Sequence, residues 1–163
     1  IDELVEAFIN LLKKYPNLKL LLVGDYEDDL NPIDKKSKKF INEFDSIISV
    51  GYKRDIRRFL GITNLFTLPS YREGLPNSLI EAGSFGIPLL ATDINGCNEI
   101  IKNNETGLLV EKKNSKSLED GIEKFIVNKN FYSYIRNNVR DEIIKRFDQK
   151  YFWKELRNEL KKF

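Results

Sequence analysis

Short apolar runs alternate with segments of helical periodicity along most of the chain. The run LKLLLVG at 18–24 is continuously apolar and ends in glycine, a pattern typical of a strand buried on both faces of a parallel sheet. SIISVG at 46–51 shows the same pattern. Further strands are predicted at 64–70, 87–93 and 106–111.

Helical spacing fills the segments between these runs. Leu4, Phe8 and Leu11 recur on one helix face near the start of the chain, and Pro16 ends that helix. Further helices are predicted at about 33–44, 54–62, 77–86, 95–104 and over most of the chain after residue 115. The alternation predicts an α/β fold, a Rossmann-like parallel sheet with helices on both faces.

The C-terminal helices are expected to pack on this sheet. We predict a Rossmann-like domain, truncated at its N-terminus, at 1–127 and a helical tail at 128–163 that packs on it. The aromatic residues expected to make this contact are Phe131, Tyr132, Tyr134, Phe147, Tyr151, Phe152 and Trp153.

The first residues already belong to a predicted helix, and the chain contains no methionine. We therefore expect a fragment whose upstream residues are missing. In doubly wound topology the first strand is central, so the strand that should precede this helix is expected to be absent.

Composition narrows the class of protein. With 27 basic and 25 acidic residues among 163, the net charge of +2 gives no reason to expect a nucleic-acid partner. The single cysteine, Cys97, excludes an internal disulfide and fits a cytoplasmic location, and the absence of histidine argues against a zinc site. No apolar run is long enough to span a membrane.

The segment YREGLPNSLIEAG at 71–83 carries the strongest chemical signal. It follows the strand at 64–70 directly, and ligands of parallel α/β sheets bind outside the carboxyl ends of the strands. Gly74 and Pro76 make a turn of little bulk, and a helix starting near Asn77 offers free N–H groups to an anion. Glu73 and Glu81 lie on either side and can accept hydrogen bonds from hydroxyl groups. A sugar nucleotide carries both kinds of group.

A structural interpretation competes with this one. Ser78 and Glu81 match a capping box, in which each side chain satisfies a backbone N–H group of the other. Glu73 would then be a solvated turn residue. The capping box does not explain Glu73, Gly74 and Pro76 together at the end of a strand.

The stretch EGLPNSLIEAGSFGIPLLATDINGCNEII resembles the E-x7-E signature region of family-four retaining glycosyltransferases with the GT-B architecture. The two glutamates of the signature fall on Glu73 and Glu81, and the resemblance covers roughly residues 1–127 in matching order. It is greatest to bacterial enzymes that build capsular or lipid-linked surface polysaccharides. The resemblance implies that this chain is most of the C-terminal, donor-binding domain.

The resemblance also implies roles for individual residues. Glu81 would bind the ribose hydroxyls, and Glu73, the catalytic residue, would meet the donor hexose near the reacting carbon. Backbone groups of the turn would line the diphosphate and sugar, and two loops at other strand ends would lie near the base. These donor-binding residues are Gly74, Leu75, Pro76 and Asn77 in the turn, and Gly24, Gly51 and Tyr52 in the loops.

The implied reaction moves a hexosyl group from a nucleotide sugar, with a UDP-sugar expected, to a saccharide or lipid-linked acceptor. It proceeds with retention and requires no metal or other cofactor. The family's arginine and lysine on the phosphates would precede Ile1, and the acceptor site belongs to a missing N-terminal domain of the same chain. The fragment alone should therefore be inactive. The intact enzyme would be cytoplasmic, at the inner face of the cell membrane, which the basic C-terminal helix could contact peripherally.

Two other functions stay open. The chain could be a catalytically inactive nucleotide-sugar-binding module, although the retention of both glutamates argues against this. It could also be a GT-B-type sugar-nucleotide epimerase, but such an enzyme commonly needs histidine for proton transfer and this chain has none.

Other polar residues have ordinary structural explanations. Arg72 is expected in a surface ion pair, Glu99 on the surface, and Cys97 in packing. The acidic residues after the first strand lack the spacing of a calcium loop, so we expect a solvated loop rather than a metal site. They are Asp25, Glu27, Asp28 and Asp29.

Overall fold

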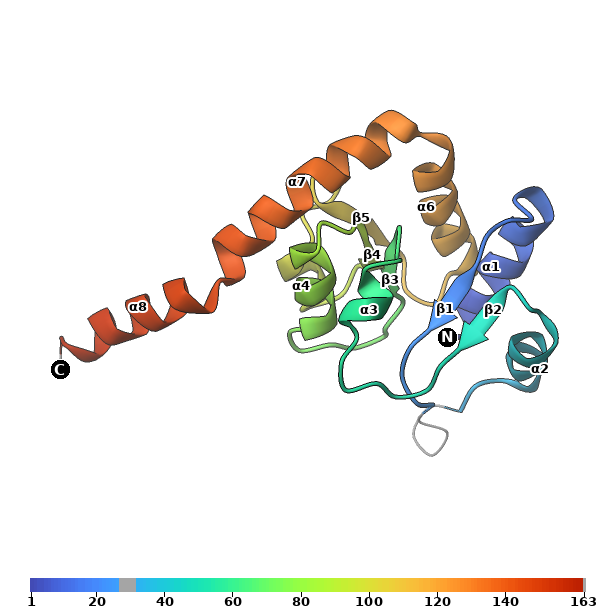
Figure 1. Ribbon diagram of the computed structural model, residues 1–163, viewed down its shortest axis with the longest axis horizontal. Coiled ribbons are helices and arrows are strands. Elements are labelled where there is room, and N and C mark those ends of the chain that lie inside the picture. Colours follow the sequence, from blue (N-terminus) through green and yellow to red (C-terminus); the bar gives the residue numbers. More distant parts are fainter. Residues whose placement is uncertain (27–31, 163) are drawn as a thin grey trace.

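The computed structural model describes residues 1–26 and 32–162, apart from the side chains of Tyr151 and Phe152. Its strands form two parallel sheets (Figure 1). β1 (Leu20–Leu22) pairs with β2 (Ile47–Ser49). The second sheet has the order β3-β4-β5, with β3 at Phe66–Leu68, β4 at Leu89–Thr92 and β5 at Gly107–Val110. A strand forms in each predicted range, and the α/β class is confirmed.

Helices occupy the segments predicted for them. Their bounds are α1 Asp2–Lys14, α2 Lys35–Glu43, α3 Arg57–Leu60, α4 Asn77–Ser84, α5 Cys97–Ile100, α6 Ser115–Val127, α7 Lys129–Phe147 and α8 Gln149–Leu160. The short helices α3 and α5 are each a single turn, because the apolar residues there span only one turn before a glycine or a polar stretch.

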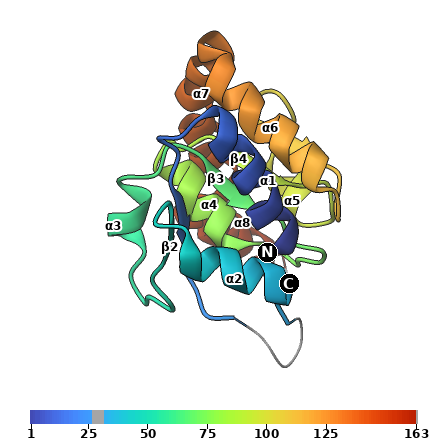
Figure 2. The same ribbon diagram turned by 90° about the vertical axis from the view of Figure 1, so that its right-hand side faces the viewer.

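The helices cover both faces of the larger sheet. Leu90 of β4 faces one layer, formed by α1 and α6, which lie side by side in Figures 1 and 2. Leu89 and Ala91 face the opposite layer, formed by α4, α5 and α7. This split follows from the alternation of side chains along a strand. The smaller sheet packs on α1 and α2 through Leu22 and Ile47.

The prediction that the first two strands are buried on both faces is wrong. Val23, directly after β1, is 39% exposed and Ile48 of β2 is 45% exposed, whereas all of β4 is buried. The cause is that α1 and α2 both lie on the face formed by Leu22 and Ile47. The other face of this small sheet is consequently open.

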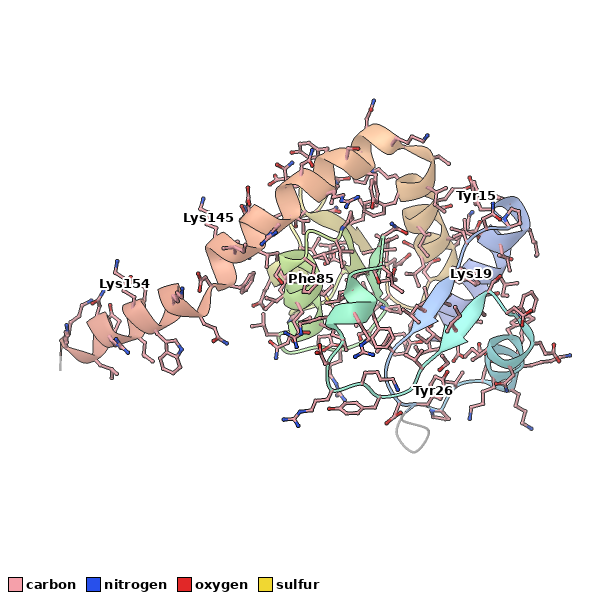
Figure 3. The ribbon with its side chains drawn as sticks, viewed as in Figure 1. Tyr15, Lys19, Tyr26, Phe85, Lys145 and Lys154 are labelled. Carbon is pink, nitrogen blue, oxygen red and sulfur yellow. The ribbon has the colours of Figure 1, made fainter. Side chains whose placement is uncertain are left out.

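The C-terminal helices differ from each other. α7 packs on α4, with Ile135, Val139 and Ile143 buried, whereas α8 continues away from the body, where Figure 3 labels Lys154. Of the aromatic residues expected to pack, Phe131, Tyr132 and Phe147 join the core. Tyr134 is instead 51% and Trp153 54% exposed, which corrects the prediction for these two.

Tyr151 and Phe152 lie outside the described side chains. The domain division at residues 127 and 128 stays a prediction. Among the described residues, every helix is too short or too polar to cross a bilayer.

Candidate active site

The helix that follows β3 begins without a side-chain cap. The residue at its N-cap position is Pro76, whose extended backbone leads the chain into α4. By contrast, α2, α6 and α7 each begin with an Asp or Asn side chain that accepts a backbone N–H group of the first turn. The first turn of α4 therefore presents N–H groups and the positive end of the helix dipole at the carboxyl edge of the sheet, where an anion can bind.

The capping-box interpretation of Ser78 and Glu81 is wrong. Ser78 lies inside α4 rather than before it, and no side chain caps the helix. Glu81 is exposed, and within the described residues its carboxylate has no hydrogen-bond or ion-pair partner. A ligand can therefore bind this carboxylate without breaking any interaction among the described residues.

Glu73 lies where two loops of the larger sheet meet. Gly96 approaches the turn so closely that a Cβ atom there would lie 2.1 Å from the carbonyl oxygen of Gly74. Gly96 also has a φ of 85°, a conformation that glycine adopts easily. Glu73 is half-buried, and its negative charge helps to raise the pKa of Cys97, the first residue of α5. The turn that holds Glu73 is thus positioned by backbone packing from the next strand-to-helix connection.

The loops after β1 and β2 are joined at the same edge. The N–H of Gly24 donates to the carbonyl of Gly51 (3.0 Å), and the N–H of Tyr52 donates to Oδ1 of Asp25 (2.9 Å). The side chain of Tyr52 is 67% exposed. Figure 3 shows Tyr26, whose hydroxyl bonds Ser49 (2.8 Å), at the lower end of the smaller sheet. The structure thus brings together Gly24, Gly51 and Tyr52, as the sequence predicts.

Tyr71 connects the turn to helices far away in the sequence. Its hydroxyl donates to the carboxylate of Glu3 in α1, and Lys113, before α6, lies 5.1 Å from its ring centroid. Burial, followed by the hydrogen bond to Glu3, raises the pKa of Tyr71 to about 12. Sequence reasoning missed this residue, because a contact across 68 positions leaves no local pattern.

The family model for group 1 glycosyltransferases matches residues 1–142. The chain belongs to this family.

Similar proteins agree with that assignment. The capsular polysaccharide biosynthesis glycosyltransferase CapM of Staphylococcus aureus is 31% identical over 156 residues, 96% of this chain and 41% of that protein. An Escherichia coli UDP-Gal:alpha-D-GlcNAc-diphosphoundecaprenol alpha-1,3-galactosyltransferase is 28% identical over 133 residues, 82% of this chain and 34% of that protein. The chain therefore spans well under half the length of these relatives.

The fold of the group 1 glycosyltransferases is also confirmed by a crystal structure. The C-terminal domain of LpcC, a group 1 glycosyltransferase of Francisella tularensis, is similar with a TM-score of 0.79 and 26% identity. The match covers 90% of this chain and 78% of that one. The chain thus has the fold of a C-terminal glycosyltransferase domain.

The remaining candidate residues are Glu99, Arg72 and the acidic residues that follow β1. Glu99 is exposed, as expected, and lines a cleft of about 710 Å³ together with Arg146. Arg72 is exposed. It forms no ion pair with any carboxylate of the described residues, so the expected surface ion pair is not found there. Glu27, Asp28 and Asp29 lie outside the described residues.

Among the described residues, three carboxylates lie close enough together to hold a metal ion. Oxygen atoms of Glu119, Asp120 and Glu123 lie within 4.8 Å of one another on α6. Lys14 and Lys116 pair with these carboxylates at 2.9–3.8 Å, so the group already has counter-charges. Its chemistry is that of an ion-pair network at the contact between α1 and α6.

Cys97 is expected to resist alkylation. Burial, and secondly the charge of Glu73, raise the pKa of its thiol to about 11, so at pH 8 almost no reactive thiolate forms. We expect iodoacetamide to leave Cys97 unmodified in the native protein and to modify it fully after denaturation, as read by peptide mass spectrometry. Rapid native labelling at pH 8 would show that the contact between the two loops opens readily.

Proposed function

We propose that this chain is the donor-binding part of a retaining glycosyltransferase. In the intact protein it moves a hexosyl group from a nucleotide sugar to a saccharide or lipid-linked acceptor during synthesis of a bacterial surface polysaccharide. One observation carries the proposal. Two carboxylates without a hydrogen-bond partner among the described residues, those of Glu73 and Glu81, flank an uncapped helix N-terminus at the carboxyl edge of a parallel sheet.

Each group at the carboxyl edge of the sheet binds a different part of the donor. The N-terminus of α4, with backbone of Gly74, Leu75, Pro76 and Asn77, binds the diphosphate and part of the sugar. Glu81 accepts hydrogen bonds from the ribose hydroxyls, which replace the water around its exposed carboxylate. The joined loops of Gly24, Gly51 and Tyr52 lie beside the base, on which the exposed tyrosine ring can stack.

The reaction breaks the bond between the donor's anomeric carbon and the diphosphate oxygen, and the acceptor hydroxyl forms the new bond on the same face. The α4 N-terminus stabilises the negative charge that grows on the leaving diphosphate, so this step needs no metal. Glu73 acts beside the positively charged sugar of the transition state and forms no covalent bond to it. Its half-buried position strengthens this electrostatic effect.

Two relatives support the substrate classes. The names of CapM and of the Escherichia coli galactosyltransferase refer to capsular polysaccharide and to a lipid-diphosphate acceptor with a UDP-sugar donor. By similarity we propose a UDP-sugar as donor and a saccharide or lipid-linked saccharide as acceptor. An N-terminal domain of the same protein would hold this acceptor, in the cytoplasm at the inner face of the membrane.

Calorimetric titration of UDP, GDP and ADP into the intact protein tests donor binding. We expect one nucleotide to bind, and Glu81→Ala to weaken its binding by about 1–3 kcal/mol, because the ribose hydroxyls lose a charged acceptor. This corresponds to roughly 5- to 150-fold in Kd. Thermal unfolding of the variant should match that of the wild type, since Glu81 has no described partner to lose.

Two control variants separate binding from folding. Glu105 is exposed and precedes β5, at the opposite edge of the sheet, so Glu105→Ala should leave nucleotide affinity unchanged. Ser78→Ala tests the cap and should leave stability unchanged, because Ser78 caps nothing. Equal affinity of Glu81→Ala and wild type for every nucleotide would refute the proposed donor site.

A further inference from the structure

The one-turn helix α5 contacts the turn that holds Glu73 at one end and the last residues of α7 at the other. At its N-terminus Gly96 packs on the backbone of Gly74, where an added Cβ would lie 2.1 Å from the carbonyl oxygen. Cys97 and Ile100 of α5 are buried in the cluster that also contains residues of α4 and α7. The position of α5 therefore bears directly on the position of the turn.

Arg146 of α7 holds the C-terminal end of α5. Its guanidinium donates from Nη1 to the carbonyl of Ile100 (3.1 Å) and from Nη2 to the carbonyl of Glu99. A helix leaves the carbonyls of its last turn without partners inside the helix, and α5 consists of a single turn. The guanidinium presents its donors in a fixed planar fork, so it bonds two neighbouring carbonyls at once.

Helix α7 is itself fixed against the rest of the site. It lies next to α4 (Figure 1), and its Ile143 approaches Gly83 of α4 so closely that a Cβ at Gly83 would lie 2.6 Å from that side chain. Glu142 pairs with Lys102, two residues after α5, at 2.5 Å, and its carboxylate lies 3.9 Å from Nε of Arg146. The same helix thus holds α4, whose N-terminus faces the candidate site, and α5, which packs on the turn.

The cleft of about 710 Å³ adjoins this contact. Its lining comes from Asn98 and Glu99 of α5 and from Lys145, Arg146 and Phe147 at the end of α7. Because no side chain fills the cleft, α5 has room to shift into it once the bonds from Arg146 are removed. Such a shift would withdraw Gly96 from the turn that it supports.

We infer that Arg146 is a positioning residue for the transfer reaction, because it holds α5 and thereby keeps Gly96 against the turn that carries Glu73. The inference rests on the proposed role of Glu73. Arg146 bonds the backbone of α5 and acts on the reaction only through that turn. Its removal should consequently loosen α5 and lower the rate only while Glu73 is present.

Alkylation of Cys97 in the intact protein reports the position of α5 without any substrate. Arg146→Met keeps the apolar stem of the side chain and removes its donors. In this variant iodoacetamide should modify Cys97 at least about tenfold faster at pH 8 than in the wild type, because α5 opens more often. Arg140→Met, the same substitution at an exposed residue of α7, should leave the labelling rate unchanged.

Transfer kinetics of the intact enzyme test the link to Glu73. Arg146→Met should lower kcat by about 10- to 100-fold, because a small misplacement of a catalytic group costs a factor of this order. Arg146→Lys keeps the charge but lacks the fork, so it should recover part of the rate. In the Glu73→Gln background, Arg146→Met should lower kcat by less than about a further threefold, since no carboxylate is left to position. Arg140→Met should leave kcat unchanged.

Thermal unfolding selects a temperature at which each variant is folded, and Arg146→Lys carries both comparisons if Arg146→Met does not fold. Unchanged labelling of Cys97 would show that Arg146 does not hold α5 and would overturn the inference. An equal loss of kcat with and without the Glu73 carboxylate would also overturn it, because Arg146 would then act independently of Glu73. An unchanged kcat for Glu73→Gln would instead refute the proposed role of Glu73, and faster labelling of Cys97 would then show a structural contact only.

Discussion

Glu73→Gln is expected to lower kcat of the intact enzyme by about 10²- to 10³-fold while the donor KM changes by less than about threefold. This is the usual loss when one preorganised electrostatic contact to a transition state is removed. Glutamine keeps the shape of the side chain and removes only its charge. A contact stronger in the transition state than in the ground state affects kcat and leaves KM almost unchanged.

The structure allows this variant to fold normally. Within the described residues the Glu73 carboxylate makes no hydrogen bond and no ion pair, so its replacement removes nothing from the fold. Steady-state transfer rates at varied donor concentration measure the effect, and the anomeric configuration of the product reports retention. Thermal unfolding should differ from wild type by no more than about 0.5 kcal/mol.

The matched control is Glu105→Gln, the same substitution at an exposed site beyond the amino end of β5. It should leave both kinetic constants unchanged. A kcat for Glu73→Gln equal to that of this control would remove Glu73 from the reaction. A loss confined to KM would instead make it a ground-state binding residue, and the charge argument for the transition state would be wrong.

Much of this fold could be predicted because its signals are local. The apolar run at 87–91 continues into Thr92, and β4 (LLAT) is buried at all four positions, as such a run predicts. The run at β1 looks similar but leaves Val23 39% exposed. Only the helices that arrive from elsewhere decide whether the second face of a strand is covered, and a single run contains no information about them.

The candidate site could also be predicted only in part from the sequence. Glycine and proline in the turn, and the helix after it, predict the position of Glu73 and Glu81 at a strand end. The sequence could not decide between a capping box with Ser78 at the N-cap and an open helix end with Pro76 there, because a shift of only two residues in the helix start separates them. The link from Tyr71 to Glu3 is long-range and could not be predicted.

Gly96→Ala is expected to damage both folding and activity more than any other single-methyl change at the site. The added Cβ would lie 2.1 Å from the carbonyl oxygen of Gly74 and 3.3 Å from that of Glu73, and both are backbone atoms. The φ of 85° adds backbone strain of about 1–3 kcal/mol. Overpacking adds roughly another 1–3 kcal/mol. Urea unfolding should show a stability loss of about 2–6 kcal/mol for this domain, the range that these two costs give together.

The turn can escape the clash only by moving, and this predicts the accompanying loss of transfer activity. Gly74→Ala is the matched control, because a Cβ at Gly74 meets no atom within 4 Å. It should unfold like the wild type, yet bind the donor more weakly if the diphosphate approaches that backbone. Normal transfer by Gly96→Ala at a temperature where it stays folded would show that the turn need not rest against Gly96. The catalytic position of Glu73 would then have to be set by the donor itself rather than by the packing of the two loops.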